Sequence, residues 1–382
     1  MRNPFRFGQM VDEEHFCNRK EEIASLEQNL AGGQSIVLYS PRRMGKSSLM
    51  ARVKDQLVRQ GLVVSRVDFY ALNSVAKIVQ EVASASARAV LDETGDIQKF
   101  LEKIATIFKR LRFKFIPGPN GSLTIEPEIA TPVEVHENLA DALTSLNEFL
   151  AKKGKRGVLI FDEFQEIYLL DANLEAEFRT IIQTLTSLSF AFLGSKAHII
   201  TSMFSDRNRP FYLAAKLFEL GPIEEQDFIP FIKNRFATCG VEISDSFAAK
   251  IVATTDGHPD YTQRLCSHIF DLASGKQLFL DETLIDEAAQ IMIRSCGNIF
   301  VALWESFTLR QQQVLSILAE HGTLRRVSSI LLAPYDMAAT SYNTALREMV
   351  KRGVVTKDSE GFYHIADGFF SRWIAGEREV WF

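Results

Sequence analysis

The sequence predicts an α/β protein with a mostly parallel sheet, followed by a helical part and a small C-terminal part of helices and a short ribbon. Two observations carry this prediction. Up to about Leu220, short apolar runs alternate with longer stretches of helical periodicity, which is typical of βαβ units. Beyond that point the pattern is mostly helical until two short apolar runs near the C-terminus.

The composition is that of an ordinary globular chain. Its 382 residues suit two or three domains at roughly 100–200 residues each. Hydrophobic residues make up 46% and charged residues 24%, which excludes wholesale disorder. With 43 Lys+Arg against 48 Asp+Glu, the formal net charge of -5 gives no bulk support for nucleic-acid binding.

Cysteine usage and the absence of long apolar runs predict a cytoplasmic protein without a membrane partner. The four cysteines contain no C-x-x-C pair, which argues against a structural zinc site or a secreted disulfide framework. The N-terminus lacks the apolar run of a signal peptide, and no apolar stretch is long enough for a transmembrane helix.

The elements of the first part follow in order from their patterns. Asn18–Leu30 predicts a helix because Ile23, Leu26 and Leu30 share one face. Ser35–Tyr39 is an apolar run between turn residues, as in a buried parallel strand. Further helices are predicted at Ser47–Gln60 and about Ser74–Leu91, and strands at Leu62–Phe69, Gly157–Phe161, Phe190–Leu193 and, more weakly, Leu217–Leu220.

One segment breaks the alternation of strands and helices. Arg112–Ile116 and Ser122–Ile125 alternate apolar and polar residues on either side of Gly118-Pro119-Asn120-Gly121. Such a pattern around a turn predicts a β-hairpin, inserted at about 112–126.

The remaining chain predicts two smaller domains. Glu224 to about Ala289 is helical and is interrupted at Gly257-His258-Pro259. Helices at Leu309–Glu320 and Ala338–Arg352 precede two short strands, the outline of a winged helix-turn-helix. We therefore expect an α/β domain at 1–222, a helical lid domain at 223–298 and a winged helix at 299–382.

The strongest functional signal is a phosphate-binding loop between the first strand and the next helix. Backbone N–H groups and the helix N-terminus would cradle the phosphates, Lys46 would neutralise their charge, and the Ser47 hydroxyl would hold Mg²⁺. Ser40 replaces the first glycine of G-x-x-x-x-G-K-[ST], a position that mainly permits a tight turn. The candidate nucleotide contacts are Ser40, Pro41, Arg42, Arg43, Met44, Gly45, Lys46, Ser47 and Ser48.

A second signal is the strand Val158–Phe161, which ends in Asp162 and Glu163. In a Walker B element, Asp162 would reach Mg²⁺ through a water, and Glu163 would orient and deprotonate the attacking water. An apolar run before Asp-Glu is weak alone, because a helix N-terminus also favours acidic residues. Its position after another parallel strand strengthens the prediction of a nucleotide site.

Two further pairs of residues could have either a catalytic role or an ordinary structural one. Ser195 or Lys196, after the strand Phe190–Leu193, could sense the γ-phosphate; an ordinary strand-to-loop turn is the alternative. Arg207 or Arg209 could be an arginine finger, with a solvated charged loop as the alternative for each.

Together these segments resemble the prokaryotic "archaeal ATPase" family, which belongs to the STAND class of P-loop ATPases, relatives of the AAA+ proteins. The segments that carry the resemblance are Phe5–Arg19 (notably Phe16-Cys17-Asn18-Arg19), Pro41–Ser47, Phe161–Glu166, Phe192–Lys196, Pro210–Tyr212 and Gly257–Pro259. The resemblance implies ATP rather than GTP, and a nucleotide-dependent switch instead of metabolic turnover. With the Mg²⁺ expected at Ser47 and Asp162, the predicted cofactors are ATP or ADP and Mg²⁺. It also implies that Phe16 and Arg19 approach the adenine, and that Pro259 contacts ADP as part of a Gly-x-Pro motif. From the residues alone, Gly257–Pro259 could equally be a plain helix-to-helix turn.

The winged helix has no charge excess for DNA, since residues 301–382 hold 9 Lys+Arg and 9 Asp+Glu. A recognition helix at Thr340–Arg352 would offer Ser341, Tyr342, Asn343, Arg347, Lys351 and Arg352. Structural use or protein binding is favoured over DNA binding, with an unknown protein or self-association as the partner.

The resulting prediction is a slowly hydrolysing switch ATPase in which Lys46, Glu163 and Ser195 are catalytic. Two alternatives stay open: a DNA-binding initiator or recombination-type AAA+ protein, and a nucleotide-locked scaffold with negligible turnover.

Overall fold

The computed structural model describes residues 2–117, 123–128, 132–276, 280–358 and 360–377. The chain forms two compact units. One, the α/β unit, contains Arg19–Arg42 and Lys46–Gly221. The other, the helical unit, contains Met1–Asn18, Arg43–Gly45 and Pro222–Phe382. Among the described residues, no helix is both long and apolar enough to cross a membrane.

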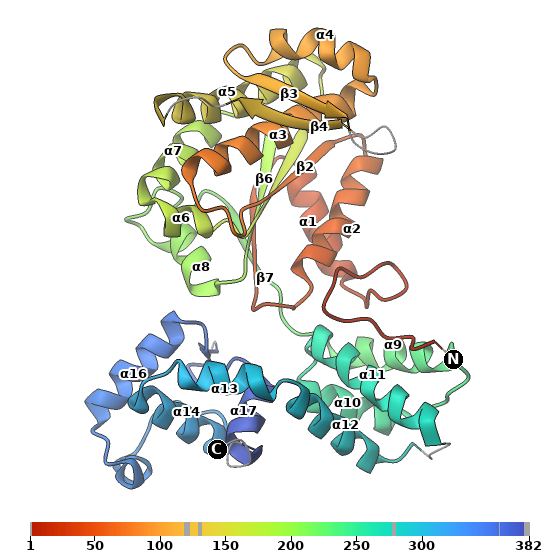
Figure 1. Ribbon diagram of the computed structural model, residues 1–382, viewed down its shortest axis with the longest axis vertical. Coiled ribbons are helices and arrows are strands. Elements are labelled where there is room, and N and C mark those ends of the chain that lie inside the picture. Colours follow the sequence, from red (N-terminus) through yellow and green to blue (C-terminus); the bar gives the residue numbers. More distant parts are fainter. Residues whose placement is uncertain (1, 118–122, 129–131, 277–279, 359, 378–382) are drawn as a thin grey trace. The chain divides into compact units, whose positions relative to one another are not determined.

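The α/β unit contains the predicted parallel sheet (Figure 1). Its five strands lie in the order β2-β5-β6-β1-β7, and every neighbouring pair is parallel. The central strands β5 and β6 are buried along their whole length, which explains their uninterrupted apolar sequences. The strands are β1 (Ile36–Tyr39), β2 (Val63–Asp68), β5 (Gly157–Asp162), β6 (Leu188–Gly194) and β7 (Lys216–Glu219).

Helices pack around this sheet, and phenylalanines fill much of the core between them. Phe161, Phe164 and Phe192 contact one another with ring centroids 4.5–5.9 Å apart. The helices are α1 (Lys20–Ala31), α2 (Lys46–Arg59), α3 (Val75–Thr94), α4 (Ile97–Ile107), α5 (Pro132–Lys152), α6 (Glu166–Leu170), α7 (Ala172–Ile182) and α8 (Ala197–Ser205).

The inserted hairpin consists of β3 (Arg112–Pro117) and β4 (Leu123–Glu128), which pair antiparallel. It lies against α3, and Phe115 contacts Phe100 of α4 edge to face. The predicted turn at Gly118–Gly121 lies outside the described residues.

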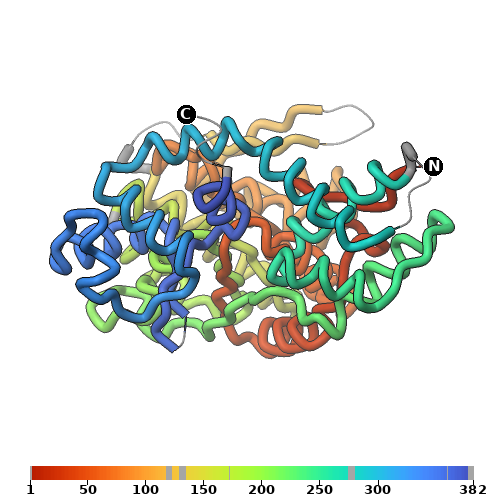
Figure 2. The backbone as a smooth tube through the Cα atoms, turned by 90° about the horizontal axis from the view of Figure 1, so that it is seen from below, coloured from red at the N-terminus to blue at the C-terminus, as the bar shows by residue number. Residues whose placement is uncertain are grey.

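The helical unit contains the lid helices and the winged-helix elements. Buried side chains from both parts, from Phe228 to Ile374, belong to a single hydrophobic cluster. Figure 2 follows the chain from the teal lid helices into the blue winged-helix part. The lid helices are α9 (Glu225–Ala237), α10 (Asp245–Thr255), α11 (Pro259–Lys276) and α12 (Glu282–Ser295). The winged-helix elements are α13 (Gly297–Glu305), α14 (Leu309–His321), α15 (Ser329–Leu332), η2 (Ala333–Tyr335), α16 (Ala339–Lys351), β8 (Val355–Lys357), β9 (Tyr363–Ile365), α17 (Gly368–Arg372) and η3 (Trp373–Glu377).

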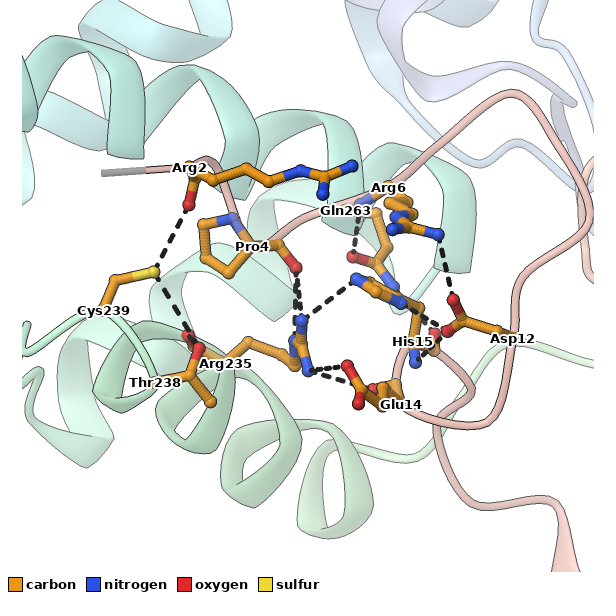
Figure 3. Close-up of polar contacts among 10 residues, drawn as sticks. All are labelled: Arg2, Pro4, Arg6, Asp12, Glu14, His15, Arg235, Thr238, Cys239 and Gln263. Carbon is orange, nitrogen blue, oxygen red and sulfur yellow. Dashed lines mark hydrogen bonds and ion pairs between the residues drawn. The ribbon is translucent and has the colours of Figure 1, made fainter.

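The N-terminal segment is held on the lid by a buried arginine of α9 (Figure 3). The Arg235 guanidinium donates to the carbonyl oxygen of Pro4 at 2.8 Å and to that of Glu14 at 3.3 Å. It also lies 3.0 Å from Nε2 of His15. Because a guanidinium can only donate, Nε2 of His15 accepts, and its Nδ1–H donates to Asp12 at 2.5 Å. This hydrogen bond lowers the pKa of Asp12.

Candidate functional site

The predicted site residues of the α/β unit lie at one edge of the sheet. Strands β1, β6 and β5 are parallel neighbours, so their carboxyl ends meet at that edge. Lys46 and Ser47 begin α2 directly after the loop that follows β1, Asp162 ends β5 and Glu163 follows it, and Ser195 directly follows β6.

Lys46 supplies a buried cation inside the loop. Its Nζ donates to the carbonyl oxygens of Ser40 at 2.9 Å and Pro41 at 3.0 Å, and to Ser40 Oγ at 3.1 Å. Burial lowers the pKa of Lys46 to about 8, although the nearby carboxylates of Glu163 and Asp162 oppose this shift. The ammonium therefore stays mostly protonated at neutral pH.

The backbone of the loop explains why serine is accepted at its first position. Gly45 has φ +90° and Arg43 has φ 65°, whereas Ser40 does not adopt a positive φ. The Ser40 hydroxyl also contacts Lys46, which a glycine could not do. Elsewhere in the loop and first turn, Pro41, Arg42 and Arg43 are exposed, and Met44 and Ser48 are buried.

Ser47 and Asp162 form a pair of oxygen donors of the kind that Mg²⁺ prefers. The Ser47 hydroxyl donates to Asp162 Oδ2 at 3.2 Å. Burial raises the pKa of Asp162, and the ion pair with Arg66 of β2 opposes this effect. Arg66 was not predicted from the sequence, although an arginine within an otherwise apolar strand was an available signal.

Glu163 and Ser195 are brought into direct contact. Glu163 directly follows β5 with φ 52°, and its Oε2 accepts a hydrogen bond from Ser195 Oγ at 2.7 Å. The backbone N–H of Ser195 lies 3.3 Å from the same oxygen. The alternative sensor, Lys196, instead pairs with Glu166 at 2.8 Å.

The two arginines after α8 differ sharply in their surroundings. Arg209 forms an ion pair with the buried Glu175, and its guanidinium stacks 3.9 Å from the Tyr168 ring. Arg209 is thus engaged within its own unit, while Arg207 is exposed. Of the two, Arg207 is the one available to a second molecule.

The remaining predicted residues lie away from this cluster or in the other unit. Arg19 precedes α1 and bonds Gly221 and Glu22 within the α/β unit. Phe16 is half-buried in the N-terminal segment, and Pro259 begins α11 of the lid. Their contacts with adenine or ADP stay predictions.

The parallel sheet, the lysine loop and the carboxylates at its edge define a P-loop ATPase. The chain belongs to the family described as an ATPase domain predominantly from Archaea, whose profile matches residues 16–265. A second profile, described as "Probable winged helix domain", matches residues 298–376 and agrees with the predicted C-terminal fold.

Solved structures share this architecture over nearly the whole chain. The Walker-type ATPase PABY2304 of Pyrococcus abyssi is 17% identical with a TM-score of 0.66, covering 97% of this chain and 99% of that one. The ORC2 protein of Aeropyrum pernix, in ADPNP-ADP complexes, is 14% identical with a TM-score of 0.58, covering 98% and 99%. At these identities the likeness shows the fold alone. Among curated proteins, no sequence matches this chain significantly.

Proposed function

We propose that the protein binds ATP with Mg²⁺ at this edge of the sheet, hydrolyses it slowly and works as a nucleotide-dependent switch. One observation carries the proposal: Lys46, the Ser47–Asp162 pair and the Glu163–Ser195 pair converge where three parallel strands end. This set contains a cation for the phosphates, hard oxygen donors and a carboxylate base.

Each residue has a distinct role in the proposed reaction. Lys46 stabilises negative charge on the phosphates, and Glu163 accepts the proton of the attacking water. Ser195 contacts both Glu163 and the terminal phosphate. Bound Mg²⁺ would neutralise charge on the phosphate oxygens. In the described part of the chain no cluster of three His, Cys, Asp or Glu side chains is arranged for a metal, so Ser47 and Asp162 would hold the ion together with the nucleotide.

The construction of the helical unit supports the switch. Tyr261, two residues after Pro259, donates a hydrogen bond to Asp367 at 2.5 Å and contacts Phe369 of α17 with ring centroids 5.0 Å apart. Burial and the Asp367 carboxylate both raise the pKa of Tyr261, so its hydroxyl remains a donor at neutral pH. A nucleotide contact at Pro259 would thereby displace the winged helix together with the lid.

The contacts of α16 and of Arg352, which directly follows it, do not favour DNA binding. Tyr342 is buried in the winged-helix core, and Arg352 stacks on Phe307 and bonds Ser306. Two of the residues that a recognition helix would offer are therefore used within the fold. Salt-dependent DNA affinity that disappears with Arg347→Ala and Lys351→Ala would reverse this conclusion.

The test is the nucleotide content and turnover of the purified protein beside Lys46→Ala and Glu163→Gln. We expect tightly held ADP and slow phosphate release, with nucleotide lost in Lys46→Ala and turnover lost in Glu163→Gln. Steady turnover with free exchange would contradict the switch. Unchanged phosphate release in Glu163→Gln would favour a nucleotide-locked scaffold with negligible turnover. A protein that holds no nucleotide and shows no thermal shift with Mg·ATP would refute the proposal.

A further inference from the structure

Gln165 is a fully buried residue that lies between two carboxylates. It is the N-cap residue of α6, and its side chain has no exposed surface. Its amide nitrogen Nε2 donates to Glu163 Oε2 at 2.5 Å and lies 3.3 Å from Glu166 Oε1. Glu166 is itself fixed by the ion pair with Lys196. No role for this glutamine was predicted from the sequence.

The chemistry of its neighbours determines how the amide is oriented. Carboxylate oxygens only accept hydrogen bonds, so the NH₂ group faces Glu163 and Glu166. The amide oxygen Oε1 then points away and, among the described residues, finds no donor although it is buried. Gly194 makes room for it, because a Cβ at that position would lie 2.6 Å from Oε1. Leaving the buried acceptor Oε1 unpaired costs free energy. The hydrogen bonds from Nε2 to the carboxylates must therefore contribute more free energy than this cost.

This arrangement makes the two oxygens of Glu163 unequal. Oε2 accepts from three donors, which are Gln165 Nε2, Ser195 Oγ and the Ser195 backbone N–H. Its lone pairs are therefore occupied. Oε1 accepts no hydrogen bond from the described residues and is the oxygen left to take a proton.

We propose that Gln165 is a positioning residue for ATP hydrolysis, which together with Ser195 holds Oε2 of Glu163 and presents Oε1 to the attacking water. This inference rests on the proposed function. In the step that it serves, the water oxygen bonds to the γ-phosphorus while its proton passes to Oε1. The bond from the γ-phosphorus to the bridging oxygen breaks, and ADP leaves with that electron pair.

The experiment compares Gln165→Met with wild type, since methionine keeps the length of the side chain but cannot donate. We expect kcat to fall about 10- to 100-fold, the loss for one hydrogen bond to a charged group. The KM for ATP and the Kd for a fluorescent ATP analogue should stay within about twofold. Gln183→Met, at an exposed position of the same unit, is the matched control and should leave all three quantities unchanged.

A double-mutant cycle separates positioning from a general structural role. Single-turnover rates, which detect the residual hydrolysis of Glu163→Gln that steady-state turnover does not, should show that Gln165→Met causes no further loss in that background, because the two residues act as one unit. A full additional loss in that background, or a kcat loss matched by weaker nucleotide binding, would overturn the inference. If the methionine variant does not fold, Gln165→Leu, which also cannot donate, replaces it, and the same loss of kcat is expected.

The outcomes also distinguish this inference from the proposed function. Turnover that disappears in Glu163→Gln but is unchanged in a folded Gln165→Met overturns the inference alone. A wild-type protein that binds ATP and never hydrolyses it overturns both.

Discussion

The guanidinium of Arg19 donates a hydrogen bond to the carbonyl oxygen of Gly221 at 2.6 Å, joining two residues that are 202 positions apart. Arg19 is the first residue of the α/β unit and Gly221 is its last. The bond therefore ties together two of the points at which the chain enters or leaves that unit. Asn18 and Arg19 both have positive φ, so the backbone turns sharply at the same place.

We expect Arg19→Ala to destabilise the α/β unit where its first and last residues meet. Arg19 is 7% exposed, so loss of its hydrogen bonds should reduce the free energy of unfolding by about 1–3 kcal/mol. Urea denaturation measures this change, and hydrogen exchange should become faster at residues 219–222. Arg59→Ala, at an exposed position of α2, is the control and should change stability by less than about 0.5 kcal/mol. Equal effects of both substitutions would contradict the role of Arg19.

Tyr261→Phe tests the connection between the lid and the winged helix. The ring contact with Phe369 is kept, while the hydrogen bond to Asp367 is lost. We expect the free energy of unfolding to fall by about 1–2 kcal/mol, because a partly buried charged acceptor loses a donor. Tyr70→Phe removes a hydroxyl at an exposed position and should have no effect. A Tyr261→Phe protein as stable as wild type would show that Asp367 is satisfied without this bond.

The two arginines after α8 should respond differently to substitution. Arg209→Ala leaves Glu175 buried without its ion-pair partner, so we expect a loss of about 3–5 kcal/mol in the free energy of unfolding. Arg207→Ala should leave stability unchanged, since Arg207 is exposed. If self-association completes the site, Arg207→Ala should lower turnover at high protein concentration only. Thermal melts and concentration-dependent phosphate release measure the two effects, and equal stability losses would refute the distinction.

The stability of the lid should depend on pH through His268. Burial lowers the pKa of His268 below its usual 6.5, with Arg264 acting in the same direction and Asp271 opposing. The unfolded chain therefore binds the proton more readily. The contribution of neutral His268 to the free energy of unfolding is fully present above pH 6.5 and is lost as the pH falls through the lowered pKa. Between pH 8 and pH 5.5, the Tm of wild type should fall more than that of His268→Gln, and parallel curves would contradict this.

The sequence predicted the sheet well because burial leaves a strong local signal. Strands β5 and β6 are covered on both faces, so their apolar residues run without interruption. The edge strand β7 is mostly exposed, and its pattern was correspondingly weak. Helix α5 was not predicted, although Leu139, Leu143, Leu146 and Leu150 recur at helical spacing and are buried.

The identities of the site residues were easier to predict than their partners. The lysine loop and the Asp-Glu pair are local motifs, and their order along the chain placed them at one edge of the sheet. The role of Gln165 depends on the positive φ of Glu163 and on the space beside Gly194 in another strand. The pairing of Arg66 with Asp162 depends on the register of β2 against β5. Neither relationship is encoded in a short stretch of sequence.

The hydrogen bonds that Arg235 donates to the N-terminal segment have a consequence for synthesis on the ribosome. The carbonyl oxygen of Pro4 meets its arginine 231 residues later in the chain. At about 5–20 residues per second, the residues around Pro4 leave the ribosome on the order of ten seconds or more before the helix that binds them. Until then they are open to proteases and chaperones. A bulky tag fused ahead of Pro4 would compete with this late docking.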